Sequence, residues 1–294
     1  MQVNPRLRRV TAVLVLAAGI LAIPALFAGC GRGRVVTLRG SATMAPLVWK
    51  WAREFMGGHP GITVLVESTD SDSGISVLIT GGADIGMSSR PPTKSELEAA
   101  IARRGEGAKA VAVALDAVAV FVNMKNPIDR VTLETLRDIY TGKIRDWKKA
   151  GGQKGPLIAC GDVRGSGTRE WFRDQVLGGA DYTPLIGVYP GADGVVSAVM
   201  ADSRAVGIGS SAFLKGVRII RVAIKPYERG FDPSDVAMAS GKYPLSRNLY
   251  FCISGKPSSD ASLFLEWVLS PEGQRMCRDA GYFPVHPVKR TQNE

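Results

Sequence analysis

Histidine and cysteine are scarce in this chain of 294 residues, and their scarcity excludes several classes of site. The two histidines, His59 and His286, have no second histidine or cysteine at the spacing of a zinc site. We therefore expect no metal site and no cofactor. Catalysis that depends on a histidine base could draw only on these two residues, which the sequence places in a turn and near the C-terminus.

The four cysteines are too few, and too oddly distributed, for a disulfide framework. Cys30 follows an apolar N-terminal run, which leaves the odd number Cys160, Cys252 and Cys277. Cys252 and Cys277 could pair in an oxidising compartment. Three buried thiols are the default expectation.

Clusters of lysine and alternating basic and aromatic residues are also missing, so nucleic acid is not expected as a partner. The formal net charge is nevertheless +10. A basic surface suits an anionic ligand or an anionic membrane face, and a merely solvated surface explains it equally well.

The first 29 residues have the pattern of an export signal peptide. A positive segment with Arg6, Arg8 and Arg9 precedes the apolar run 10–26. A permanent membrane helix is the alternative, but the run is near the lower limit for spanning a bilayer and ends in small residues. The ending 27–30, Phe-Ala-Gly-Cys, resembles the lipobox of bacterial lipoproteins, which implies lipid attachment at Cys30 and an extracytoplasmic location.

Strand and helix patterns alternate along the rest of the chain, which predicts an α/β fold with doubly wound, mostly parallel sheet. In such folds ligands collect beyond the carboxyl ends of the strands. The apolar stretch 110–122 is too long for one ordinary strand and contains Asp116 in its middle. We interpret it as a first crossing between two lobes.

Two segments rich in glycine, serine and threonine run from a strand into a helix, at 40–47 and 163–169. The unpaired N–H groups at a helix start, together with the helix dipole, bind anions. In the second segment Ser166 and Thr168 add hydroxyl donors, and Arg164 and Arg169 add positive charge. Each segment alone could be an ordinary helix cap.

Seven motifs, in order along the chain, resemble those of the phosphate-binding lipoproteins of bacterial ABC importers. The runs 141–147 and 165–169 are the most distinctive of them. The full set is 40–47, 83–90, 139–147, 165–169, 205–209, 243–247 and 281–285.

This resemblance implies a two-lobed periplasmic-binding-protein fold with the ligand cleft between the lobes. Lobe I would comprise 34–117 and 240–287, lobe II 118–239, with hinge crossings near 114–120 and 222–248. The ligand contacts that it implies are Thr43, Met44, Ser71, Arg90, Ser166, Gly167 and Thr168, with Ser41, Arg164 and Arg169 as further candidates.

The sequence departs from the family at two places. Family members often have an arginine three residues before the glycine of the Gly-Ser-Gly-Thr run and an acidic residue just before it, whereas this chain has Asp162 and Arg164. We predict that Arg164 contacts the ligand directly, oriented by Asp162. Asp70 and Asp72 also bring negative charge near the expected site, and they could point outward, accept a ligand proton, or pair with Arg90 or Arg164.

The sequence thus predicts a non-enzymatic, monomeric phosphate-binding component of an ABC importer, with permease subunits as partners and a lipid anchor in the membrane. Alternatives are a protein for another oxyanion (molybdate, tungstate or sulfate) and a surface sensor without transport. A secreted phosphoester hydrolase with Ser166 or Ser71 as nucleophile is less well supported, because the chain has no Gly-x-Ser-x-Gly elbow.

Overall fold

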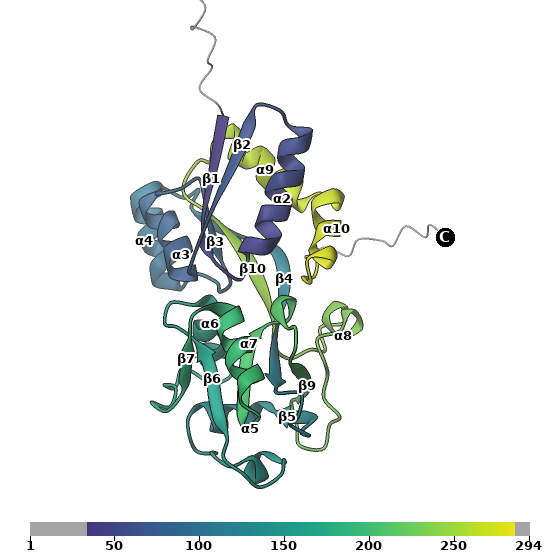
Figure 1. Cartoon of the computed structure of the whole chain (residues 1–294). Helices are drawn as coiled ribbons and strands as arrows, with labels where there is room; N and C mark the ends of the chain where they lie inside the picture. The colour runs from purple at the N-terminus through teal and green to yellow at the C-terminus, as the bar shows by residue number, and fades with distance from the viewer. Residues whose placement is uncertain (1–33, 286–294) are drawn as a thin grey trace, which may run out of the picture.

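The structure, a computed structural model, describes residues 34–285 and shows two lobes stacked one on the other (Figure 1). The predicted signal peptide (1–29), Cys30 and His286 lie outside the described residues. The upper lobe of Figure 1 contains β1 (Arg34–Ser41), α2 (Ala45–Gly58), β2 (Ile62–Thr69), α3 (Ser71–Thr80), β3 (Ile85–Ser88), α4 (Lys94–Arg104), α9 (Ser259–Leu269) and α10 (Pro271–Asp279). The lower lobe contains β5 (Arg130–Thr132), α5 (Leu133–Tyr140), β6 (Ile158–Asp162), α6 (Gly167–Gln175), β7 (Gly187–Tyr189), α7 (Gly191–Ala201), β8 (Ala205–Ser210), β9 (Arg218–Ala223) and α8 (Asp235–Ala239).

The sheet of the upper lobe is built around β1, which runs parallel to β2 on one side and β3 on the other. α2 packs on this sheet with the face that the sequence predicts, and Trp51 and Phe55 on it are fully buried. At Gly40, where φ is 136°, a Cβ would lie 2.2 Å from the carbonyl oxygen of Met87. Only glycine therefore allows β1 to approach β3 this closely and turn toward α2.

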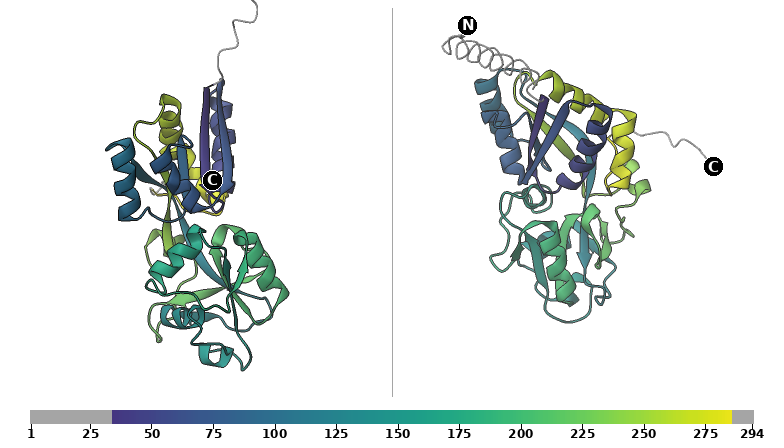
Figure 2. Two further views of the ribbon diagram at one scale, coloured as in Figure 1. Left: turned by 90° about the vertical axis from the view of Figure 1, so that its left-hand side faces the viewer. Right: turned by 45° about the horizontal axis from the view of Figure 1, so that its top comes forward.

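Two strands, β4 (Lys109–Val122) and β10 (Ser246–Ile253), connect the lobes, which remain distinct in both views of Figure 2. β4 is one continuous strand of 14 residues, and it contains the stretch 110–122 that we interpret from the sequence as a crossing. Its first part pairs antiparallel with β10, and its last part pairs with β8 and β9.

Each lobe has its own hydrophobic core, and both connecting segments pass from one core to the other at the same height. On β4 the upper cluster ends at Ala114 and the lower one begins at Ala117. On the returning chain, Leu245 packs in the lower cluster and Leu249 in the upper one. The lobe limits predicted from the sequence stay a prediction. The change of core between Leu245 and Leu249 indicates that the second crossing lies at the start of β10.

The predicted fold class is confirmed. The strand order is β2-β1-β3-β10-β4-β8-β6-β7, with β9 pairing β4 and β5. Pairs within each lobe are parallel, and antiparallel pairs occur where β4 and β10 are involved. Within residues 34–285 no helix is both long enough and apolar enough to cross a membrane.

The three cysteines that the structure describes are free and buried. Burial raises the pKa of Cys160 to about 11 and the pKa of Cys252 and of Cys277 to about 12. They therefore stay protonated at neutral pH and pack as apolar side chains.

Candidate functional site

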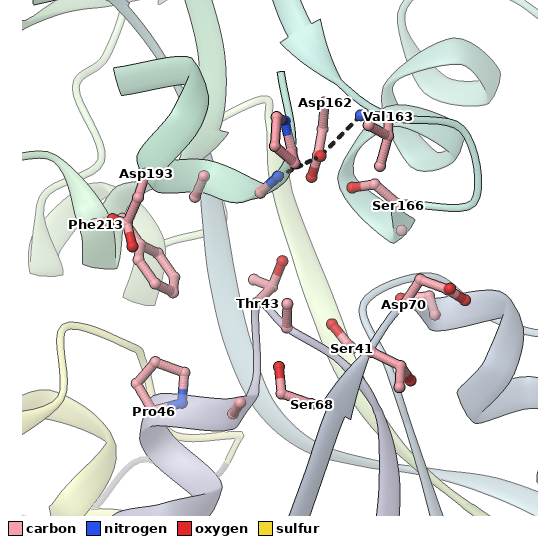
Figure 3. Close-up of a pocket in the computed structure, with 18 of the residues that line it drawn as sticks. Ser41, Thr43, Pro46, Ser68, Asp70, Asp162, Val163, Ser166, Asp193 and Phe213 are labelled. Carbon is pink, nitrogen blue, oxygen red and sulfur yellow. Dashed lines mark hydrogen bonds between the residues drawn. The ribbon is translucent and has the colours of Figure 1, made fainter. Parts of the chain in front are cut away.

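A cavity of about 450 Å³ lies between the lobes (Figure 3, where the lower lobe is at the top). The turn after β1 and the end of β2 form its upper-lobe wall, and the loop from β6 to α6 and the start of α7 form its lower-lobe wall. The polar members of the lining are Ser41, Thr43, Ser68, Thr69, Asp70, Ser71, Asp162, Ser166 and Asp193. The walls that meet here are thus the polar turns after parallel strands, as the fold class predicts.

The lower-lobe wall includes the start of α6. Ser166 is the N-cap residue, and its side chain makes no capping hydrogen bond. The N–H groups of the first turn have no partner within a helix, so they remain available to a ligand at the positive end of the dipole. A Cβ on Gly167 would lie 2.2 Å from the Oγ atoms of both Ser71 and Ser89, so glycine alone allows the lobes to meet here.

The upper-lobe wall includes the start of α2, where Met44 and Ala45 donate their N–H groups to backbone carbonyls of the preceding turn. The N-cap of α2 is the buried residue Met44, which provides no side-chain hydrogen bond. Before it, the Oγ1 atom of Thr43 lies 3.5 Å from the Oγ1 atom of Thr168 in the other lobe. Ser41 is 1% exposed, and its hydroxyl has no hydrogen-bond partner among the described residues. The two helix starts predicted from the sequence therefore face each other across the cleft.

Ser71 lies at the first turn of α3 and makes a serine pair that the sequence analysis did not find. Its Oγ atom accepts a hydrogen bond from the N–H of Ser89 at 3.0 Å and lies 3.1 Å from the Ser89 Oγ atom. Both side chains are fully buried. Ser89 precedes Arg90 in the motif 83–90, which was the only available signal.

Arg90 is held by carboxylates of its own lobe. Its guanidinium donates to Asp72 at 2.7 Å and to both oxygens of Glu96, at 2.8 and 3.0 Å. Burial opposes the charges, but these hydrogen bonds outweigh it, so the pKa of Arg90 is raised and the pKa of Glu96 is lowered. Asp72 thus follows one of the predicted alternatives, the pairing with Arg90. Asp70 caps α3 by accepting from the N–H of Ser73 at 2.7 Å.

The charges around α6 differ from the predicted arrangement. The carboxylate of Asp162 does not orient Arg164, because its Oδ1 atom accepts from the N–H groups of Val163 and Gly191, both at 2.8 Å. It thereby occupies the N-terminus of α7. Arg164 is exposed and forms no ion pair within the described chain. Arg169 donates to the carbonyl oxygen of Asp162 at 2.8 Å, and its guanidinium lies 4.3 Å from the ring centre of Tyr182.

A buried ion pair lies at the connection between the lobes, behind Thr168. The Nε and Nη2 atoms of Arg247 donate to Oδ2 of Asp116 at 3.0 and 2.7 Å. The second carboxylate oxygen accepts from the hydroxyl of Ser210 at 2.6 Å. Nη2 of Arg247 also donates to Oγ1 of Thr168 at 2.8 Å. Arg247 is 3% exposed and Asp116 is fully buried.

No local sequence pattern assigns this pair to the site. Asp116 and Arg247 are 131 residues apart and meet because they are register partners on β4 and β10. The available signals were the carboxylate inside an apolar run and the arginine that ends the motif 243–247.

His59, the histidine that the structure describes, does not lie beside Ser71 or Ser166. The ring of His59 stacks on Phe55 at 4.1 Å, and its Nδ1 atom lies 2.9 Å from the carbonyl oxygen of Phe55, at the far end of α2. Nor does any group of three or more histidine, cysteine or acidic residues within 34–285 suit a metal ion.

Comparison with known sequences shows the class of protein that this fold and cleft define. Residues 31–272 match the family described as PBP superfamily domain, and the chain belongs to that family. The recognition from the ordered motifs is thereby confirmed at the level of the family.

Its relatives are named for the binding of one ligand. The chain is 28% identical to the phosphate-binding protein PstS of Pseudomonas aeruginosa over 267 residues, covering 85% of this chain and 82% of the relative. It is 28% identical to PstS of Bacillus subtilis over 263 residues, covering 88% and 83%. Among solved structures, it is similar to a putative phosphate ABC transporter substrate-binding protein with bound phosphate from Clostridium perfringens, with a TM-score of 0.77, 26% identity and coverage of 86% and 100%.

Proposed function

We propose that this protein captures phosphate outside the cytoplasm and delivers it to an ABC importer. One observation carries the proposal: two helix starts without side-chain caps, those of α2 and α6, face each other across the cleft. The hydroxyls of Thr43 and Thr168 approach to 3.5 Å at this point. The first N–H groups of α6 and the hydroxyls of both lobes suit an oxyanion, since donors to a charged group form strong hydrogen bonds.

The cleft would work by hinge closure. Because a Cβ on Gly167 would lie 2.2 Å from the Oγ atoms of Ser71 and Ser89, the lobes are in close contact beside the start of α6, and we expect them to move apart to admit a ligand. β4 and β10 are the strands about which such a movement would occur. The phosphate named for the relatives and for the neighbouring structure supports this ligand.

The cavity lining favours phosphate over sulfate. Asp70 and Asp162 line the cavity, and the pocket lining includes no lysine or arginine. A carboxylate repels a fully ionised oxyanion but can accept a hydrogen bond from a protonated one. Phosphate carries a proton at neutral pH, whereas sulfate does not. Molybdate and tungstate, which also carry no proton at neutral pH, are disfavoured for the same reason. These two oxyanions are the alternative ligands to be tested, and capture by a sensor is the alternative role.

The protein is proposed to be a binding protein and not an enzyme, in line with the names of its relatives. The signal peptide 1–29, the lipid anchor at Cys30 and the monomeric state remain predictions from the sequence. Cys30→Ser should leave the precursor unprocessed and shift it out of the lipid-modified membrane fraction. A variant that is processed and fractionates like the wild type would contradict the anchor.

Calorimetric titration of the mature chain with phosphate, arsenate, sulfate and molybdate tests the ligand. We expect one site for phosphate, similar binding of arsenate and much weaker binding of sulfate. Stronger binding of molybdate than of phosphate would assign the protein to that alternative ligand. Turnover of a phosphoester by the purified chain would overturn the proposal of a non-enzyme.

A further inference from the structure

The buried guanidinium of Arg247 has one nitrogen without a hydrogen-bond partner among the described residues. This nitrogen is Nη1, which is itself buried. Leaving such a donor unpaired is costly, and unsatisfied buried groups in native proteins call for a specific explanation. The other two nitrogens of the same guanidinium are bound to Asp116 and Thr168.

The unpaired donor belongs to a group that touches the proposed anion site. Nη2 donates to the hydroxyl of Thr168, which is on the first turn of α6 and 3.5 Å from the hydroxyl of Thr43. The guanidinium is therefore fixed behind Thr168, next to the cavity but not among the residues that line it. A planar guanidinium presents several donors in one fork, so it can keep Asp116 and Thr168 and still serve an oxyanion.

The other arginines near the cleft are engaged elsewhere or exposed. Arg90 is bound to Asp72 and Glu96, and Arg169 is turned toward the carbonyl of Asp162 and the ring of Tyr182. Arg164 is exposed. Of these four side chains, only Arg247 contacts a hydroxyl of the proposed site.

We infer that Arg247 supplies the positive charge to the bound oxyanion, and that Asp116 is the positioning residue that holds it. The inference rests on the proposed binding of an oxyanion. Asp116 keeps the guanidinium in place through Oδ2, while Ser210 satisfies the other carboxylate oxygen. The carboxylate also neutralises part of the charge that the ligand would otherwise receive. If the ion pair were only structural, Asp116 would not compete with a ligand for the charge of Arg247.

Because Asp116 and the ligand compete for the charge of Arg247, a ligand-binding role and a structural role predict different changes in phosphate affinity when the carboxylate is removed. In Asp116→Asn the amide oxygen can still accept from Arg247 and hold the guanidinium in place, but the counter-charge is gone, so phosphate becomes the counter-ion. We expect phosphate to bind about threefold to tenfold more tightly, whereas a structural role predicts no change or weaker binding.

The double variant Asp116→Asn/Arg247→Gln then removes the charge of Arg247 while residue 116 stays neutral. We expect it to bind inorganic phosphate about 10- to 150-fold more weakly than Asp116→Asn, as for the loss of a hydrogen bond to a charged group. The matched control is Asp202→Asn/Arg204→Gln, which removes an exposed aspartate–arginine pair of 2.7 Å after α7. It should bind phosphate within about twofold of the wild type.

Titration calorimetry with inorganic phosphate, together with thermal unfolding of each chain, decides the outcome. Equal affinity of Asp116→Asn and the double variant would overturn the inference and leave the proposed function standing. If the double variant does not fold, the single variant decides, and weaker phosphate binding by folded Asp116→Asn overturns the inference. A wild-type chain that binds no phosphate overturns the proposed function and the inference with it.

Discussion

Replacement of Thr168 by valine removes a hydroxyl that lies between the two lobes and keeps the shape of the side chain. In the structure this hydroxyl accepts from Nη2 of Arg247 at 2.8 Å and lies 3.5 Å from the hydroxyl of Thr43. The side chain is 5% exposed, so water cannot easily replace the lost group. A hydrogen bond to a charged group contributes about 1.5–3 kcal/mol, so Thr168→Val should weaken phosphate binding roughly 10- to 150-fold.

The same substitution removes one acceptor of Arg247, so the free protein should also lose about 1 kcal/mol of stability. Calorimetric titration measures the affinity, and urea unfolding without phosphate measures the stability. Thr141→Val is the matched control, because its hydroxyl donates to the carbonyl of Arg137 at the exposed end of α5. Affinity of Thr168→Val within twofold of the wild type would refute the assignment of this hydroxyl to the ligand.

Three further substitutions test the neighbouring features. Gly167→Ala places a Cβ 2.2 Å from the Oγ atom of Ser71, so it should block closure and weaken phosphate binding by at least about 100-fold in calorimetry with little change in thermal unfolding; wild-type affinity would contradict the close approach. Asp162→Asn keeps the Oδ1 acceptor but removes its charge, so sulfate should bind several-fold more tightly at low salt, and an unchanged affinity for sulfate would rule out this repulsion. Arg90→Gln removes the partner that, against burial, lowers the pKa of Glu96. A lowered carboxyl pKa stabilises the fold above the unfolded value of about 4.3 and less so as the pH falls through the folded value. This variant should therefore lose about 1 kcal/mol in urea unfolding at pH 7 and progressively less as the pH is lowered below about 4.3, and a loss that does not change with pH would contradict the ion-pair explanation.

The fold could be predicted because its signals are local. Alternating strands and helices, the buried face of α2 and the long stretch 110–122 each depend on a few neighbouring residues. The exact level of the second crossing could not be predicted in this way. Leu245 and Leu249 are both apolar, and only the packing of the two cores assigns them to different lobes.

The residues of the site also differ in whether a local sequence pattern predicts them. The helix starts at Thr43 and Ser166 are encoded by short runs, and the structure brings them face to face. The ion pair of Asp116 and Arg247 depends on the register of β4 and β10, which no local pattern specifies. The sequence predicts Arg164 as the charged contact because it lies next to the glycine-rich turn. It does not predict that Asp162 instead accepts a hydrogen bond from the N–H of Gly191 at the start of α7, 29 residues further along the chain.

A crystal structure of the mature chain with arsenate tests the central claim most directly, because anomalous scattering from arsenic locates the anion without ambiguity. We predict a single strong peak between the N-terminus of α6 and the turn at Thr43, with ligand oxygens about 2.7–3.2 Å from the first N–H groups of α6. A peak elsewhere on the molecule, with none in this cleft at saturating arsenate, would contradict the claim that the two facing helix starts form the oxyanion site.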